Sequence, residues 1–243
     1  MSLLILSILV QVALIIHVVK TGRNQIWIWV LALLSLPGAI AYIAVEVLPE
    51  LFRSRAAQRT ARGLRKAMDP GRELRRYESE TRVAGNVASR QRYAEELVRH
   101  QRYDEAIAQY REALTGLYEH DPNLMLGLAQ AQFGKGEASA ARATLDELIR
   151  HNPDFRSPAG HLLYARALEA EGNVPKALEE YAVLAPAYPG AEASVRYAQL
   201  LQAQGRRAEA QKVARELLEQ ARIAPGHYRR AQRPWLDAAQ RLL

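Results

Sequence analysis

The chain has 243 residues, enough for one or two domains, and it contains no cysteine. The lack of cysteine excludes disulfide scaffolds, thiolate metal sites and cysteine nucleophiles. A net charge of +7 and a pI near 9.8 favour an anionic partner, either a nucleic acid or a membrane surface. The distribution of the charges must decide between these partners.

The first fifty residues are strongly apolar. Residues 3–19 carry no formal charge, and residues 26–47 carry only Glu46. The first run is at the short limit for spanning a bilayer and the second is long enough with some tilt, so residues 1–50 are predicted to form a transmembrane helical hairpin. A cleaved signal peptide is the alternative for the first run. It fits poorly, because no Lys or Arg precedes the run and Lys20-Thr21-Gly22 does not resemble a cleavage site.

Basic residues near the two apolar runs predict the orientation. The short loop between the runs has Lys20 and Arg23, whereas six basic residues follow the second run. Positive charge is retained on the cytoplasmic side, so two spans of an inner membrane with both termini in the cytoplasm are predicted.

The second apolar run resembles a known membrane anchor. It begins with Trp27 and Trp29 and continues with Leu36-Pro37 followed by Tyr42, which is similar to the N-terminal hairpin of cardiolipin synthases and other phospholipase D-type proteins. The resemblance covers only these fifty residues and implies a bacterial inner-membrane anchor. It implies no activity, because those enzymes use paired H-x-K-x-x-x-x-D motifs and none of the six histidines here has Lys two residues on.

Residues 51–85 form a basic connector, with a helix break expected at Asp69-Pro70-Gly71. Each cation near an anionic bilayer contributes about 1 kcal/mol of attraction, so we expect the connector to contact anionic membrane lipid. The alternative is a solvated linker whose charges only set the topology. Nucleic acid is not expected as a partner, because aromatic residues are not interleaved with the charges. The candidate lipid-surface residues are Arg53, Arg55, Arg59, Arg62, Arg65 and Lys66.

An alanine recurs through the second half of the chain. Ala106, Ala141, Ala177 and Ala210 are spaced by 35, 36 and 33 residues. Five residues before each stands a turn residue, which is Gln101 in the first copy and Gly136, Gly172 and Gly205 in the others. A period near 34 residues with this content is typical of a helix-turn-helix solenoid.

These repeats resemble the tetratricopeptide repeat (TPR) family. The first helices carry Tyr93-Ala94, Leu128-Ala129, Tyr164-Ala165 and Tyr197-Ala198 ahead of the turn residues. The resemblance implies an all-α fold, with a TPR-like solenoid of about four helix pairs over residues 86–222. Residues 223–243 are expected to form a helix that caps the solenoid through Trp235, since a terminal repeat needs a polar outer face. A docking helix for a partner is the alternative.

The family resemblance also implies a binding surface. In TPR proteins the first helices line an inner groove, and a mixed groove of this kind suits a peptide with apolar anchors. The corresponding candidate residues are Gln91, Glu95, Leu126, Gln130, Phe133, Leu162, Arg166, Glu169 and Gln199. Phe133 has a second interpretation, as a residue that packs between neighbouring helices. The Lys/Asn/Arg clamp that some family members use for a carboxylate is not expected, because Gln91, Glu95 and Gly127 occupy its positions.

No catalytic, cofactor or metal site is predicted, since no clustered histidine motif, carboxylate pair or phosphate-binding loop occurs. The predicted function is a membrane-anchored TPR adaptor or scaffold that binds other proteins on the cytoplasmic side of a bacterial inner membrane. The alternative is a non-catalytic accessory subunit of phospholipid or envelope biosynthesis that contacts lipid through the hairpin and connector. Neither the protein partner nor the oligomeric state follows from the sequence, and a homo-oligomer stays open.

Overall fold

The computed structural model describes residues 2–21, 24, 26–47, 69 and 71–243. The chain divides into two compact units, Met1–Arg72 and Glu73–Leu243. The six candidate lipid-surface residues of the connector lie outside the described residues.

The N-terminal unit consists of α1 (Ser2–Thr21), α2 (Ile26–Tyr42) and a π-helical turn (Ile43–Val47). Pro37 lies inside α2, and the rings of Trp27 and Tyr42 on this helix are only 5.3 Å apart. A straight helix would separate two such residues by about 22 Å, so α2 doubles back near Pro37, where the ring removes a backbone donor. The second apolar run therefore forms a bent helix. Among the described residues no helix has both the length and the apolarity needed to cross a membrane.

Two polar side chains of α1, Gln11 and His17, make contacts with α2. The Gln11 amide donates to the carbonyl oxygen of Leu31 at 3.4 Å, and His17 Nδ1 lies 2.9 Å from the Tyr42 hydroxyl. Val18, Leu31 and Tyr42 are buried between the helices, whereas many large apolar side chains are exposed. The exposed apolar side chains of this unit include Val12, Ile16, Val19, Ile26, Trp29, Leu33, Leu34 and Ile40.

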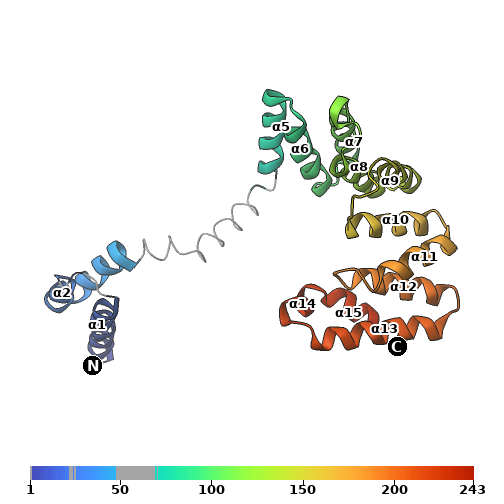
Figure 1. The fold of residues 1–243 in the computed structure, drawn as a ribbon. Coiled ribbons are helices and arrows are strands. Elements are labelled where there is room, and N and C mark those ends of the chain that lie inside the picture. The colour runs from blue at the N-terminus through green and yellow to red at the C-terminus, as the bar shows by residue number, and fades with distance from the viewer. Residues whose placement is uncertain (1, 22–23, 25, 48–68, 70) are drawn as a thin grey trace. The chain divides into compact units, whose positions relative to one another are not determined.

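The C-terminal unit is a succession of helix pairs (Figure 1). Each pair packs on the next, and we number the pairs as repeats 1 to 4. Repeat 1 is α6 (Val87–Arg99) with α7 (Tyr103–Ala113), repeat 2 is α8 (Pro122–Lys135) with α9 (Ala138–His151), repeat 3 is α10 (Pro158–Ala170) with α11 (Val174–Leu184), and repeat 4 is α12 (Glu192–Ala203) with α13 (Arg207–Ile223).

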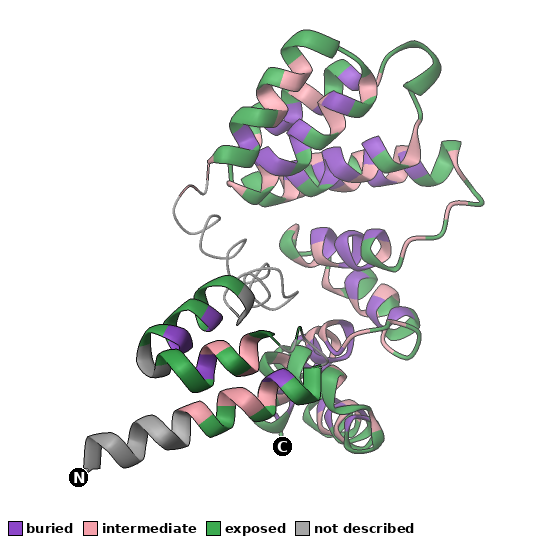
Figure 2. Cartoon of the chain, turned by 90° about the vertical axis from the view of Figure 1, so that its left-hand side faces the viewer, coloured by how far each residue is buried: buried purple, intermediate pink, exposed green. Residues whose placement is uncertain are grey.

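The recurring alanines lie in the core, as the period predicts. Ala106, Ala141, Ala177 and Ala210 are at most 1% exposed, and the alanines of the first helices are equally buried. Small residues on the facing sides let two helix axes approach, and large side chains fill the space beside them. Tyr110 and Tyr181, four residues after the alanines, supply this volume in repeats 1 and 3. Buried positions therefore follow the facing sides of the helices (Figure 2).

The same turn joins the two helices of every repeat. In repeat 2 the Gly136 N–H donates to Phe133 and the Glu137 N–H to Gln132, and Gly136 has a left-handed φ of 93°. These are the two hydrogen bonds of the Schellman motif, which usually has glycine in the left-handed position. Gly172 and Gly205 make the same pattern, and in repeat 1 Gln101 adopts it with a φ of 59°.

Further helices cover both ends of the array. α5 (Arg72–Ala84), within the stretch assigned to the connector, places Leu74 in the core of repeat 1, and its Thr81 hydroxyl donates to the Ser89 carbonyl at 3.0 Å. At the other end, α14 (Gly226–Ala231) leads into α15 (Arg233–Gln240), which packs against α12 and α13. Trp235 packs on the core of repeat 4, beneath the guanidinium of Arg196.

Candidate functional site

A groove lies between the first helices of repeats 1 and 2, and we call it the α6–α8 groove. Its volume is about 340 Å³, and it brings together four of the residues expected from the sequence, Gln91 and Glu95 on α6 and Leu126 and Gln130 on α8. On each helix these residues are four apart, a spacing that places them on one face. The remaining lining residues are Val98, Arg99, Tyr110, Asn123 and Gly127.

Close packing of Tyr110 against Gly127 forms the floor of the α6–α8 groove. A Cβ atom at Gly127 would lie 2.4 Å from Cζ of Tyr110, so only glycine leaves room for this ring. Burial raises the pKa of Tyr110, whose side chain is only 3% exposed. The floor is thus a neutral aromatic ring at neutral pH.

Amide groups dominate the walls of the α6–α8 groove. Gln91, Asn123 and Gln130 each carry a primary amide, which offers two donors and one acceptor oxygen. Gln91 donates to Glu95 at 3.1 Å, and Arg99 pairs with Glu96 at 2.6 Å, so part of the charge is compensated. Leu126 and Val98 add apolar contact surface. Amides beside small apolar patches can hydrogen-bond the backbone of an extended peptide and accept one apolar side chain.

The other candidate groove residues are not part of this hollow. Arg166 stacks over the ring of Phe133, with 4.8 Å between the guanidinium carbon and the ring centroid, and it faces Glu192 at 3.7 Å. Glu169 accepts a hydrogen bond from the Tyr181 hydroxyl at 2.7 Å. The contacts of Arg166 link repeats 2, 3 and 4 and agree with the interpretation of Phe133 as a packing residue, whereas the Glu169 bond lies within repeat 3.

Leu162 and Gln199 depart from the expected surface in opposite ways. Leu162 is 4% exposed and belongs to the main core cluster, so its placement on the groove surface is wrong. Gln199 is exposed on α12 but lines neither hollow described here.

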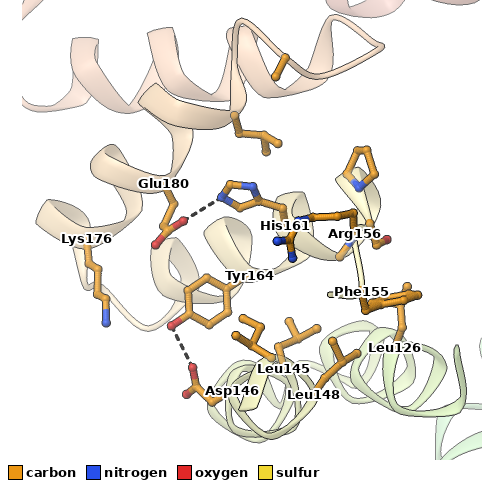
Figure 3. Close-up of a pocket in the computed structure, with 16 residues that line it drawn as sticks. Leu126, Leu145, Asp146, Leu148, Phe155, Arg156, His161, Tyr164, Lys176 and Glu180 are labelled. Carbon is orange, nitrogen blue, oxygen red and sulfur yellow. Dashed lines mark hydrogen bonds and ion pairs between the residues drawn. The ribbon is translucent and has the colours of Figure 1, made fainter. Parts of the chain in front are cut away.

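A second, larger hollow lies between repeats 2 and 3, and we call it the α9–α11 cleft. Its volume is about 600 Å³, and Figure 3 shows its walls from α9, α10 and α11, with Leu126 of α8 at one edge. The lining is mainly apolar and is formed by Leu126, Leu145, Leu148, Ile149, Phe155, Pro158, Tyr164, Leu184 and Ala187. Sequence reasoning did not find this cleft, because most of its walls are second helices, which were assumed to face away from ligands.

Charged groups surround the α9–α11 cleft. Asp146 accepts from the Tyr164 hydroxyl at 2.9 Å and pairs with Arg142 at 2.6 Å, and Glu180 lies 2.8 Å from His161 (Figure 3). Lys176 has no ion-pair partner among the described residues, and the guanidinium of Arg156 donates to the Pro153 carbonyl. Both carboxylates therefore have partners, whereas Lys176 and Arg156 form no ion pair among the described residues.

Burial raises the pKa of two tyrosines that bond carboxylates on neighbouring helices. Burial, together with the hydrogen bond and the charge of Asp146, raises the pKa of Tyr164 to about 12. Burial and the carboxylate of Glu169 raise the pKa of Tyr181. These phenols are neutral donors at physiological pH and act as structural groups between helices, not as acids or bases.

The histidines show no ligand cluster in the part of the chain that the structure describes, where no three His, Asp or Glu side chains are placed to hold a metal ion. The closest pair, His120 and His151, stacks with ring centroids 3.7 Å apart. This stack joins the loop before α8 to the end of α9.

Comparisons with known proteins agree with this geometry. Residues 97–159 match the tetratricopeptide repeat family model. No curated protein matches the sequence. Among solved structures, the chain is similar to a thermophilic TPR protein from Thermus thermophilus, with a TM-score of 0.51 and 19% identity over 70% of this chain and 86% of that chain. At this identity the likeness concerns the fold. The protein is therefore an all-α, TPR-like helical repeat protein.

Proposed function

We propose that the protein is a membrane-anchored adaptor whose TPR-like array binds a peptide segment of another protein in the α6–α8 groove. The observation that carries the proposal is the convergence of three primary amides from two repeats on one 340 Å³ hollow with Leu126 beside them. An extended peptide with one apolar anchor satisfies these amides and covers the leucine. The TPR repeats favour a protein partner and no catalytic role.

A photoreactive amino acid in place of Gln130 tests the groove in cells. We expect it to form an adduct with a defined protein, and the additional substitution Gln91→Arg should abolish that adduct by filling the groove with a charged side chain. The matched control places the photoreactive residue at Gln204, an exposed amide at the end of α12. Equal adduct patterns from the two positions would contradict a specific groove.

Membrane attachment is the second part of the proposal. The N-terminal unit turns its polar Gln11 and His17 inward and its large apolar side chains outward, which is the reverse of the arrangement favoured in water. Covering such a surface with lipid lowers its free energy, because the apolar side chains leave water. We propose that this unit anchors the chain in a bacterial inner membrane with the repeats on the cytoplasmic side, following the charge asymmetry of the sequence.

Cysteine labelling tests the anchor, because the chain has no native cysteine. In intact cells a membrane-impermeant maleimide should label Asn24→Cys in the loop after α1, provided that two spans expose this loop outside. Val83→Cys on α5, which is 87% exposed, should react only after lysis. Protection of both residues before lysis would exclude two full spans, and release of the protein by alkaline carbonate would exclude the anchor itself.

The basic connector is proposed to contact anionic lipid. Vesicles with and without phosphatidylglycerol should sediment the full chain to different extents at low salt, and neutralising the six connector cations should remove the difference. Binding that is indifferent to anionic lipid would leave these charges only a topological role.

Proximity labelling in the native membrane separates the two functions considered for the whole protein. An adaptor should enrich its groove partner, and an accessory subunit should enrich lipid-synthesis enzymes.

A further inference from the structure

We propose that the chain self-associates by inserting the 115–121 loop of one copy, between α7 and α8, into the α9–α11 cleft of a second copy. The inference goes beyond the proposed peptide groove and uses different residues. It rests on an exposed apolar loop, an apolar cleft of suitable size and the complementary charges of the two surfaces.

The loop presents apolar side chains on an ordered turn. Leu117 is 101% exposed and Tyr118 is 46% exposed, on the 3₁₀ turn Gly116–Tyr118. The N–H of Tyr118 donates to Thr115 at 3.2 Å, and the N–H of Asp121 donates to Tyr118 at 3.0 Å. Little ordering entropy is then lost when the loop is covered, which favours association.

The cleft matches this loop in size and polarity. Its volume of about 600 Å³ falls within the range of about 300–1,000 Å³ that is usual for ligand pockets. Leu145, Leu148 and Phe155 offer an apolar lining to a leucine and a tyrosine ring. Burying a leucine side chain of this kind strengthens binding by roughly tenfold to a hundredfold.

The charges of loop and cleft are complementary. Glu119 follows the two apolar loop residues, is exposed and has no ion-pair partner among the described residues. Lys176 and Arg156 at the cleft form no ion pair among the described residues. Complementary charges steer two surfaces together and fix their register.

Within one chain the loop and the cleft are neighbours. The Asn152 amide donates to the His120 carbonyl at 2.9 Å, and the N–H of Phe155, a cleft residue, donates to the carbonyl of Asn152. Because the loop and the cleft are adjacent, two copies related by a two-fold axis can each place their loop in the cleft of the other. The assembly then closes as a dimer.

Interchain disulfide formation tests the geometry directly. Two differently tagged full-length chains are co-expressed, one with Glu119→Cys and the other with Lys176→Cys, and oxidised under mild conditions. We expect a mixed dimer that joins the two tags. The matched pair Glu119→Cys with Arg230→Cys, a cation on α14, should give at most background. Equal cross-linking of the two pairs would overturn the proposal.

Charge reversal gives a second measurement that a folding defect cannot imitate. Glu119→Lys and Lys176→Glu should each weaken dimerisation about tenfold in sedimentation of the full chain in detergent, and the double exchange should restore it. Leu117→Ser should weaken dimerisation by at least tenfold, whereas Ile223→Ser should not, although Ile223 is also a largely exposed apolar residue. A monomeric wild-type chain would refute self-association. Disulfide formation within a single chain carrying both cysteines, with no mixed dimer, would show closure of the loop on its own cleft instead.

Discussion

Gln101 occupies, with a φ of 59°, the turn position that glycine fills in repeats 2, 3 and 4. A side chain in this left-handed region costs roughly 1 kcal/mol, and glycine has no such penalty. We predict that Gln101→Gly stabilises the array by about 0.5–1 kcal/mol despite the extra freedom of glycine when unfolded. The change is measured as a higher urea midpoint.

Gly172 provides the converse substitution. Its φ is 79°, and an added Cβ would meet nothing within 4 Å. Gly172→Ala should therefore lower the free energy of unfolding by about 1 kcal/mol through backbone strain alone, measured as a lower urea midpoint. If the two substitutions shifted the midpoint in the same direction, the left-handed turn would not be the source of the effect.

The raised pKa of Tyr164 predicts that the protein loses stability at alkaline pH. Its pKa is raised to about 12 in the folded protein, first by burial, and is about 10 in an unfolded chain. The folded state therefore holds this proton more tightly, and the stability it contributes is complete below pH 10 and lost as the pH rises towards 12. Tyr164→Phe should be less stable at neutral pH, because it loses the bond to Asp146, but should lose less stability above pH 10. The test is to measure the urea midpoints of both proteins across this pH range. Parallel curves would show that Tyr164 is not the source of the alkaline loss of stability.

At the residue scale the sequence was informative about buried positions and poor about exposed ones. The alanines and turn residues were predicted because helix packing and left-handed turns restrict residue type strongly. Leu162 was misplaced on the groove because the expected face of α10 was taken from the family pattern, whereas this residue packs into the shared core of repeats 2 and 3.

At the scale of the elements, the packing of the C-terminal segment on repeat 4 leads to a testable prediction about capping. Leu242, just after this helix, is 8% exposed and lies in the core cluster of repeat 4, while its neighbour Leu243 is 45% exposed. Leu242→Ala should cost about 2–3 kcal/mol through lost burial and the cavity left behind. Leu243→Ala is the matched control and should change the free energy of unfolding by under about 1 kcal/mol. Equal effects would mean that the C-terminal segment does not cap repeat 4.

The joint between repeats 1 and 2 depends on Gly127. Because a Cβ there would lie 2.4 Å from Tyr110, Gly127→Ala forces the ring or the helix to move. We predict a loss of about 1–3 kcal/mol, measured as a lower urea midpoint, and its partial recovery when Tyr110→Leu makes room. Failure of the double variant to recover would place the strain elsewhere.

The elements explain why the α9–α11 cleft was not predicted. The succession of helix pairs was predicted, because the alanine period and the turn residues lie in the sequence itself. The cleft depends on how far apart α9 and α11 stand, which the 152–157 connection and the side chains beneath it determine together. The bend of α2 was missed for a related reason, since an apolar run with one proline is compatible with a kinked span as well as a folded-back helix.

At the scale of the whole molecule, we expect the two units to have separate functions and the second to fold without the first. The second unit contains its own core clusters in every repeat, so a fragment of residues 72–243 is expected to fold without the N-terminal unit. We predict that this fragment keeps its helical circular dichroism and cooperative unfolding but no longer sediments with membranes. A fragment that unfolds would show that the first unit is needed for stability, and one that still sediments would locate the anchor within the repeats.

The uniform turns within repeats contrast with the connections between them. Each turn is closed by the same two backbone hydrogen bonds, whereas the connections at 114–121, 152–157 and 185–191 differ in length and in hydrogen bonding. We therefore expect each helix pair to move as a unit and any bending of the array to concentrate at these connections. Bending at the 114–121 connection would change the width of the α6–α8 groove, because α6 and α8 lie on either side of it.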